Sequence, residues 1–255
     1  MAARRARSLL AGEAPRAARE FGSFVFSRRR LMRGLHGDGR PVLVLPGFIG
    51  GDGSTRALRR LLRELGYHVH AWRLGRNWGP TDRIIDGLGE RVRGLLEQHG
   101  KPLTLIGHSL GGVYSREIAR AAPDAVRQVI TLGSPVRRPT GESTAVGPLF
   151  QALSPVHSDR AKSPDPQRIM RPIPVPLTAI ITKTDGVVPW RICLPELGPK
   201  VEVIEVRGSH SGLIHNPAAV AVIVDRLGRE TWEPFCETPD IGARIYSDES
   251  SERSS

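Results

Sequence analysis

Residues 103–112 read Leu103-Thr-Leu-Ile-Gly107-His108-Ser109-Leu110-Gly111-Gly112, and this stretch decides the fold of the chain. The apolar residues before Gly107 predict a buried strand and residues 113–119 predict a helix, so the pattern Gly-x-Ser-x-Gly falls at a sharp turn between them. A serine at such a turn has a strained backbone, and glycines two residues before and after it allow segments of main chain to pass close together. Free N–H groups and the positive dipole end of the following helix then favour an oxyanion beside Ser109.

The rest of the chain alternates predicted strands and helices from Arg40 onward. This pattern predicts an α/β fold, with a mostly parallel sheet and helices on both of its faces. The predicted strands are 41–45, 69–74, 103–106, 126–132, 176–182 and 201–206. The predicted helices are 54–65, 81–99, 110–121 and 216–227, the first of them capped by Ser54 or Thr55. With 255 residues, of which 39% are hydrophobic, the chain can form one such domain with a sizeable core over residues 41–229.

The net charge of the chain is +11, but its motifs do not predict a nucleic-acid-binding protein. Residues 1–40 hold ten arginines against three acidic residues, without a zinc finger, a helix-turn-helix or an RNA-binding aromatic motif. Cys193 and Cys236 are too few for a disulfide framework or a four-ligand zinc site. The phosphate-binding P-loop and the dinucleotide-binding fingerprint are absent from the sequence. We therefore expect neither a metal nor a cofactor.

The basic N-terminal arm, residues 1–40, has two interpretations. Residues 4–35 predict one or two short helices with an apolar side that includes Leu9, Phe21 and Phe26. Such a helix could lie on an anionic membrane surface, or it could pack its apolar side on the main domain with its arginines in water. The second interpretation is favoured. A charged start with no apolar run behind it does not predict a secretory signal, so a cytoplasmic protein with peripheral membrane contact at most is expected.

Two segments interrupt the alternation. Residues 134–175 are dense in proline, serine and arginine, and they fall where an insertion would cover the carboxyl ends of the strands. Long loops are uncommon without a role, so we interpret this insertion as a lid, the alternative being a long loop without substrate contact. Residues 230–255 form a polar C-terminal tail whose end is predicted to be disordered.

A nucleophilic serine needs a base, and the base needs an acid to orient it. Asp185 follows the predicted strand 176–182, and His210 follows the predicted strand 201–206. Their chain order and their places after strands predict that Asp185 orients His210 and that His210 activates Ser109. Asp185 could instead be a turn residue and His210 a surface histidine, and His215 is the main rival base.

An oxyanion hole requires two backbone donors. One is expected to be the N–H of Leu110, directly after the serine. The other is expected in the glycine-rich loop 45–53, where Phe48 is the predicted donor.

These four motifs together resemble the α/β-hydrolase superfamily, within it the bacterial lipase and esterase-like branch. The resemblance covers residues 41–229 and is carried by Pro46-Gly47-Phe48-Ile49-Gly50-Gly51, Gly107-His108-Ser109-Leu110-Gly111-Gly112, Asp185-Gly186-Val187-Val188-Pro189 and Gly208-Ser209-His210. Many relatives begin the oxyanion loop with His-Gly, and this chain has Pro46-Gly47 there, which changes a side chain and leaves the backbone donor in place.

The resemblance implies a serine hydrolase that cleaves carboxylic esters through an acyl-enzyme, without a cofactor. A small-molecule or lipid-like acyl ester is the expected partner, and neither nucleic acid nor metal is expected. An acyltransferase or a thioesterase with the same three residues is the alternative. A non-catalytic interaction protein on this fold is less favoured, because a binding module does not need all three residues.

Overall fold

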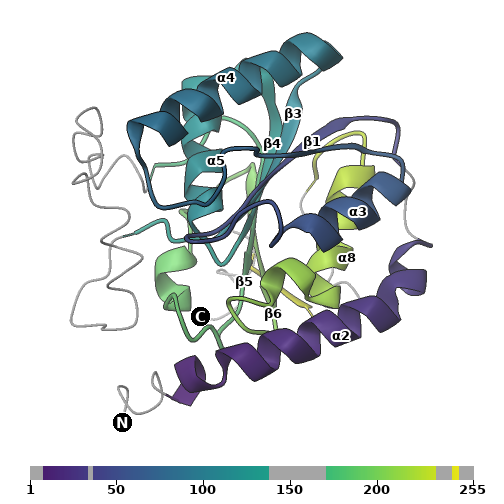
Figure 1. Ribbon diagram of the computed structural model, residues 1–255, viewed down its shortest axis with the longest axis vertical. Helices are drawn as coiled ribbons and strands as arrows, with labels where there is room; N and C mark the ends of the chain where they lie inside the picture. Colours follow the sequence, from purple (N-terminus) through teal and green to yellow (C-terminus); the bar gives the residue numbers. More distant parts are fainter. Residues whose placement is uncertain (1–7, 34–36, 138–170, 234–242, 247–255) are drawn as a thin grey trace.

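The computed structural model describes residues 8–33, 37–137, 171–233 and 243–246, which form a twisted sheet flanked by helices (Figure 1). The seven strands of the sheet are arranged in the order β2-β1-β3-β4-β5-β6-β7. They are β1 Pro41–Leu45, β2 His68–Ala71, β3 Leu103–His108, β4 Val126–Leu132, β5 Leu177–Ile181, β6 Val201–Val206 and β7 Ala243–Tyr246. Strands β1 to β6 pair in parallel, and β7 pairs antiparallel with β6. The predicted α/β fold is confirmed.

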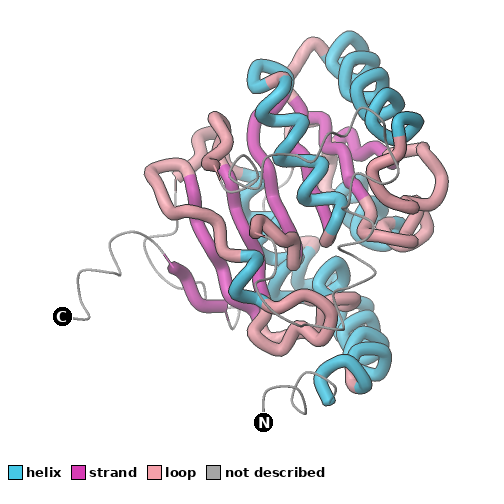
Figure 2. Tube along the Cα trace, turned by 90° about the vertical axis from the view of Figure 1, so that its left-hand side faces the viewer, coloured by secondary structure: helices cyan, strands magenta, loops and turns pink. Residues whose placement is uncertain are grey.

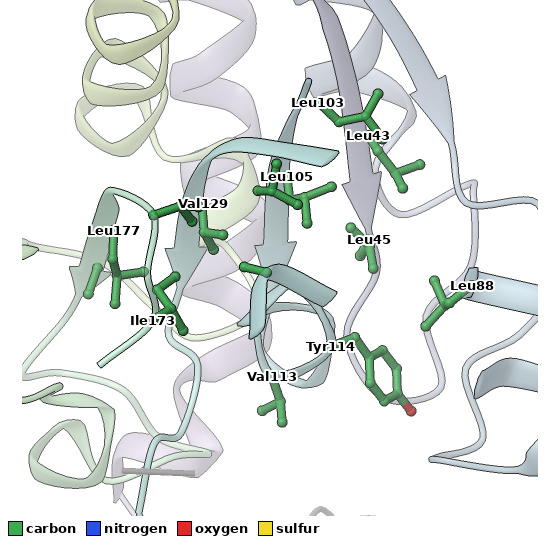
Figure 3. Packing of buried hydrophobic residues seen from close by; sticks show 14 of the residues in the cluster. Leu43, Leu45, Leu88, Leu103, Leu105, Val113, Tyr114, Val129, Ile173 and Leu177 are labelled. Atoms are coloured by element: carbon green, nitrogen blue, oxygen red, sulfur yellow. The ribbon is translucent and has the colours of Figure 1, made fainter. Parts of the chain in front are cut away.

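The inner strands β1, β3, β4, β5 and β6 bury residues on both of their faces, because helices cover both sides of the sheet, whereas the edge strand β2 is partly exposed. Leu43 and Leu45 of β1 pack on one side with residues of α4 (Asp82–His99) and α5 (Leu110–Ala121), as Figure 3 shows. The alternate residues Val42 and Val44 pack on the other side against α3 (Arg56–Glu64) and α8 (Pro217–Gly228). Figure 2 shows the sheet from a second side, with helices in front of it and behind it. The apolar runs of the strands therefore hold two core layers together.

Most element ends lie within a few residues of their predicted places, and the exceptions have local causes. Strand β2 ends at Ala71, before the predicted end, and Arg73 just beyond it has a φ of 63° that no strand contains. Thr55, one of the two predicted residues, is the N-cap of α3, but no side chain caps the helix: the hydroxyls of Ser54 and Thr55 donate to the carbonyls of Gly51 and Asp52 instead of accepting a helix N–H.

The C-terminal part of the chain differs from the expectation. The sequence does not predict strand β7, yet Ala243–Tyr246 adds an antiparallel strand to β6. The predicted lid, residues 134–175, lies largely outside the described residues, since positions 138–170 are not described. The predicted disordered end of the tail, residues 247–255, also lies outside them.

Within the N-terminal arm, α2 (Glu13–Leu31) is a single helix of 19 residues that lies along α8 (Figure 1). Its buried side includes Phe24 and Leu31, which join the core layer of α3 and α8. Phe21, Val25 and Phe26 remain exposed, Phe26 by 89%. Among the described helices none is long and apolar enough to cross a membrane. The arm thus packs on the domain, and contact of its exposed side with a membrane surface stays a prediction.

Candidate active site

Ser109 lies at the turn between β3 and α5 in a backbone conformation that serine rarely adopts. Its φ is 51° and its ψ is −118°. Its N–H donates to the carbonyl of Leu132 at the end of β4, with an N···O distance of 2.8 Å. The neighbouring strand therefore holds the strained residue in place, and strain of this kind clusters at functional sites.

The glycines of this turn are required because main chain lies against main chain. A Cβ on Gly107 would lie 2.5 Å from the carbonyl carbon of Gly111, and a Cβ on Gly111 would lie 2.7 Å from the carbonyl carbon of Leu45. Both separations are shorter than real Cβ contacts, so the small residues predicted at Gly107 and Gly111 are confirmed. Gly112 is confined as well, since a Cβ there would lie 2.7 Å from Cβ of Ser134.

Asp185 and His210 are joined by a buried hydrogen bond. Nδ1 of His210 lies 2.7 Å from Oδ2 of Asp185. The other carboxylate oxygen, Oδ1, accepts the N–H groups of Val187 and Val188 at 2.8 and 2.6 Å. Because Nδ1 donates to the carboxylate, Nε2 of a neutral His210 is left as the acceptor that a general base needs.

The pKa of His210 reflects two opposing effects. Burial of the ring lowers the pKa, and the Asp185 carboxylate raises it through its charge and its hydrogen bond. The carboxylate prevails, so the pKa of His210 is raised above the ordinary value of 6.5.

Ser109 and His210 flank the same short segment after β4. Leu132 accepts the N–H of Ser109. A Cβ on the next residue, Gly133, would lie 3.1 Å from Nδ1 of His210 and 3.3 Å from Oδ2 of Asp185. Within the described part of the chain, Ser109 Oγ makes no hydrogen bond to His210, and such bonds often tighten only when substrate binds. The structure thus brings Asp185 and His210 into contact and sets both beside the turn that carries Ser109.

His108 is a site residue to which the sequence assigned no role. Its Nε2 lies 2.9 Å from the backbone carbonyl oxygen of His210. A carbonyl can only accept, so Nε2 of His108 carries the proton. Burial lowers the pKa of His108 to about 4, which keeps the ring neutral. The residue before the serine therefore holds the backbone of the residue predicted as the base.

The rival base, His215, faces the N-terminal helix instead. Its ring centroid lies 5.1 Å from that of Phe21 and 5.9 Å from that of Phe24. Burial lowers its pKa. These contacts favour His210 as the residue paired with Asp185.

The predicted oxyanion loop runs directly beside Ser109. A Cβ on Gly47 would lie 3.2 Å from Cβ of Ser109. Among the described residues, the N–H groups of Phe48 and Leu110 make no hydrogen bond, and their role as oxyanion donors stays a prediction.

Asn77, which the sequence did not single out, holds this loop in place. Its side-chain amide donates to the carbonyl of Pro46 at 3.0 Å. Its backbone exchanges hydrogen bonds with Ile49 and Gly50 at 2.7 and 2.8 Å. The hydroxyl of Tyr114 on α5 donates to Oδ1 of Asn77 at 3.1 Å. The buried amide therefore connects the loop of Phe48 to the helix that follows Ser109.

A sequence model described as the alpha/beta hydrolase family matches residues 42–234, which include every site residue discussed so far. The chain belongs to the alpha/beta hydrolase family. A protein of Azorhizobium caulinodans that is named as a carbamate hydrolase (RutD) is 34% identical to this alpha/beta hydrolase over 101 residues. That alignment spans 37% of each protein, so the match covers about a third of the relative's length.

Solved structures with low sequence identity share the fold of this alpha/beta hydrolase. A pyrethroid hydrolase from Sphingobium faniae superposes with a TM-score of 0.53 at 19% identity, covering 75% of this chain and 98% of that one. A monoacylglycerol lipase from Paleococcus ferrophilus superposes with a TM-score of 0.51 at 18% identity, covering 75% and 96%. At these identities the likeness establishes the fold alone.

The main-chain contact at Gly111 gives a stability prediction with a matched control. Gly111→Ala places a methyl group against the carbonyl of Leu45 and should lower the free energy of unfolding by about 3 kcal/mol. Gly94→Ala, within α4, meets no atom within 4 Å and should raise it by about 0.5–1 kcal/mol. Urea unfolding of both variants measures the difference, and equal stabilities would refute the close packing of the turn.

The opposing effects on His210 give a prediction for its titration. Histidine-ring NMR should show that His210 titrates above pH 6.5 in the native protein, while His108 stays neutral until about pH 4. Asp185→Asn removes the charge that raises the pKa of His210, so this pKa should fall and burial should then dominate. His210→Gln and His108→Gln assign the two signals. An unchanged His210 pKa in Asp185→Asn would contradict the coupling.

Proposed function

We propose that this alpha/beta hydrolase cleaves carboxylic esters through an acyl-enzyme formed on Ser109. The observation that carries the proposal is the buried hydrogen bond from His210 Nδ1 to Asp185, beside the strained turn of Ser109. A serine is a weak nucleophile on its own and requires a base that the third group keeps in the correct tautomer. In the proposal, Ser109 is the nucleophile, His210 is the base and Asp185 is the group that orients the base.

In the proposed reaction, Ser109 Oγ attacks the carbonyl carbon of the ester while its proton passes to His210 Nε2. The tetrahedral intermediate then collapses, and His210 returns the proton to the departing alcohol oxygen. Water repeats the same sequence on the acyl-enzyme, with His210 again as the base, and releases the acid. Asp185 keeps Nδ1 of His210 protonated throughout and stabilises the charged ring.

The oxyanion of the tetrahedral intermediate is assigned to the N–H groups of Phe48 and Leu110. Neither donor is engaged by another described residue. Leu110 is also the first residue of α5, so the positive end of the helix dipole favours negative charge at this place. The side chain of Asn77 fixes the loop that carries Phe48, which preorganises the pair of donors.

An apolar acyl or alcohol group suits the rim of this site. Ile49 follows Phe48 and its side chain is 57% exposed, and Trp78 follows Asn77 and is 56% exposed. A backbone hydrogen bond from Ile49 to Asn77 holds the two segments together. Large apolar side chains in water beside a polar site favour contact with an apolar ligand. We therefore assign a lipid-like or aromatic ester to the site in preference to a short polar ester.

The test is a chain-length series of p-nitrophenyl esters, with acyl thioesters measured in parallel, on the native protein and on Ser109→Ala. Ester hydrolysis should occur, its kcat/KM should rise from acetate to longer acyl groups, and Ser109→Ala should lose about 10⁴-fold or more in kcat. A folded Ser109→Ala protein with undiminished hydrolysis would refute the nucleophile. Faster turnover of thioesters, or transfer of the acyl group to an added alcohol in preference to water, would instead establish the thioesterase or the acyltransferase.

A further inference from the structure

The N-terminal arm reaches the two loops that carry Asp185 and His210. Glu13, the first residue of α2, has a buried side chain although it is a carboxylate on a basic segment. Its Oε1 accepts the N–H of Gly186 at 2.8 Å and the N–H of His210 at 3.1 Å. Its Oε2 accepts the N–H of Ser211 at 3.1 Å. One carboxylate thus joins the residue after Asp185 to the backbone of His210 itself.

Two more side chains on the same face of α2 hold these loops. Arg16 donates to the carbonyl of Thr184 at 2.5 Å and also pairs with Glu13 at 3.0 Å. Glu20 accepts the N–H of Ser209 at 2.6 Å. Residues 13, 16 and 20 are spaced by three and four positions, so they lie in one line along the helix. The line faces the backbone of residues 184–186 and 209–211, the two loops that contain Asp185 and His210.

Glycines in the loops make room for the arm. A Cβ on Gly186 would lie 2.5 Å from the carbonyl oxygen of Leu9, and a Cβ on Gly212 would overlap the Glu20 carboxylate. The arm therefore packs closely against the loop that contains Gly186 and against the loop that contains Gly212.

From these contacts we propose that Glu13 is a positioning residue, which sets the distance between the Asp185 loop and the His210 loop from the first turn of α2. The role rests on the ester hydrolase proposed above. Burial of a carboxylate is unfavourable unless hydrogen bonds compensate it, and here all three backbone donors belong to the catalytic loops. A displacement of catalytic groups by 1 Å costs on the order of 10²-fold in rate.

The charge of Glu13 adds a second effect. It acts together with Asp185 to raise the pKa of His210, against the effect of burial. Loss of Glu13 should therefore move the acid limb of the pH profile to lower pH, which loss of packing alone would not do.

The experiment compares Glu13→Ala and Glu13→Gln with Leu31→Ala, a variant of a buried residue near the other end of α2. Glu13→Ala should lower kcat about 10²-fold, with KM within about twofold and the acid limb of kcat/KM at lower pH. Glu13→Gln keeps the volume and one acceptor oxygen, so it should lose about 10-fold and it carries the measurement if the alanine variant fails to fold. Leu31→Ala should lower the melting temperature and leave kcat and the pH profile unchanged.

Two outcomes would overturn the positioning role. One is a folded Glu13 variant with native kcat and pH profile. The other is a Leu31→Ala variant whose kcat falls along with its stability. Histidine NMR separates this proposal from the proposed function, because it needs no substrate. If the native protein hydrolyses no ester, the proposed function fails, while a lower His210 pKa in Glu13→Gln supports the contact and an unchanged pKa refutes it.

Discussion

At the turn between β3 and α5, segments of main chain lie against one another with no side chain between them. Gly107 faces Gly111 and Gly112, and Gly111 faces the carbonyl of Leu45 at the end of β1. This contact fixes how closely β1, β3 and α5 approach, and it holds Ser109 at its positive φ. It also places the loop after β1 beside Ser109, because Gly47 in that loop follows Leu45 by only two residues. The sheet and the site therefore share one steric constraint, and neither could shift without the other.

Around that fixed turn, the loops of the site are held by buried side chains that bind backbone atoms. Asn77 binds the carbonyl of Pro46, His108 binds the carbonyl of His210, and Asp185 binds the N–H groups of Val187 and Val188. Glu13 does the same for the loops of Asp185 and His210. Preorganised dipoles and fixed distances are what a site needs when charge develops during reaction, because they need no rearrangement at that moment.

The features that could be predicted from the sequence are those that depend on the order of neighbouring elements along the chain. Ser109 could be placed because strand, turn and helix are consecutive, and Asp185 and His210 because each follows a strand of a parallel sheet, where strand ends meet at one edge. The glycines of the turn followed from the same reasoning. Residues 4–35 were predicted to form one or two short helices, with packing on the domain as the favoured interpretation, and α2 packs in that way.

The contacts of Glu13, Asn77 and His108 could not be predicted because their partners are distant in sequence. Glu13 is separated from Gly186 by 173 positions and from His210 by 197. One signal was present: Glu13 and Glu20 stand seven residues apart, two helical turns, on a segment rich in arginine. Strand β7 was missed because its polar surroundings carry no strand pattern, and pairing with the edge of β6 decides its structure.

We propose that this constrained turn presents Ser109 as an activated nucleophile. This role is tested most directly by treating the native protein and Ser109→Ala with a fluorophosphonate, which reacts with activated serines, and by mapping the product by mass spectrometry. One phosphonyl group should form per native chain, located on Ser109, and none on Ser109→Ala. A native protein that stays unlabelled, or one labelled at another residue equally in both proteins, would contradict this role.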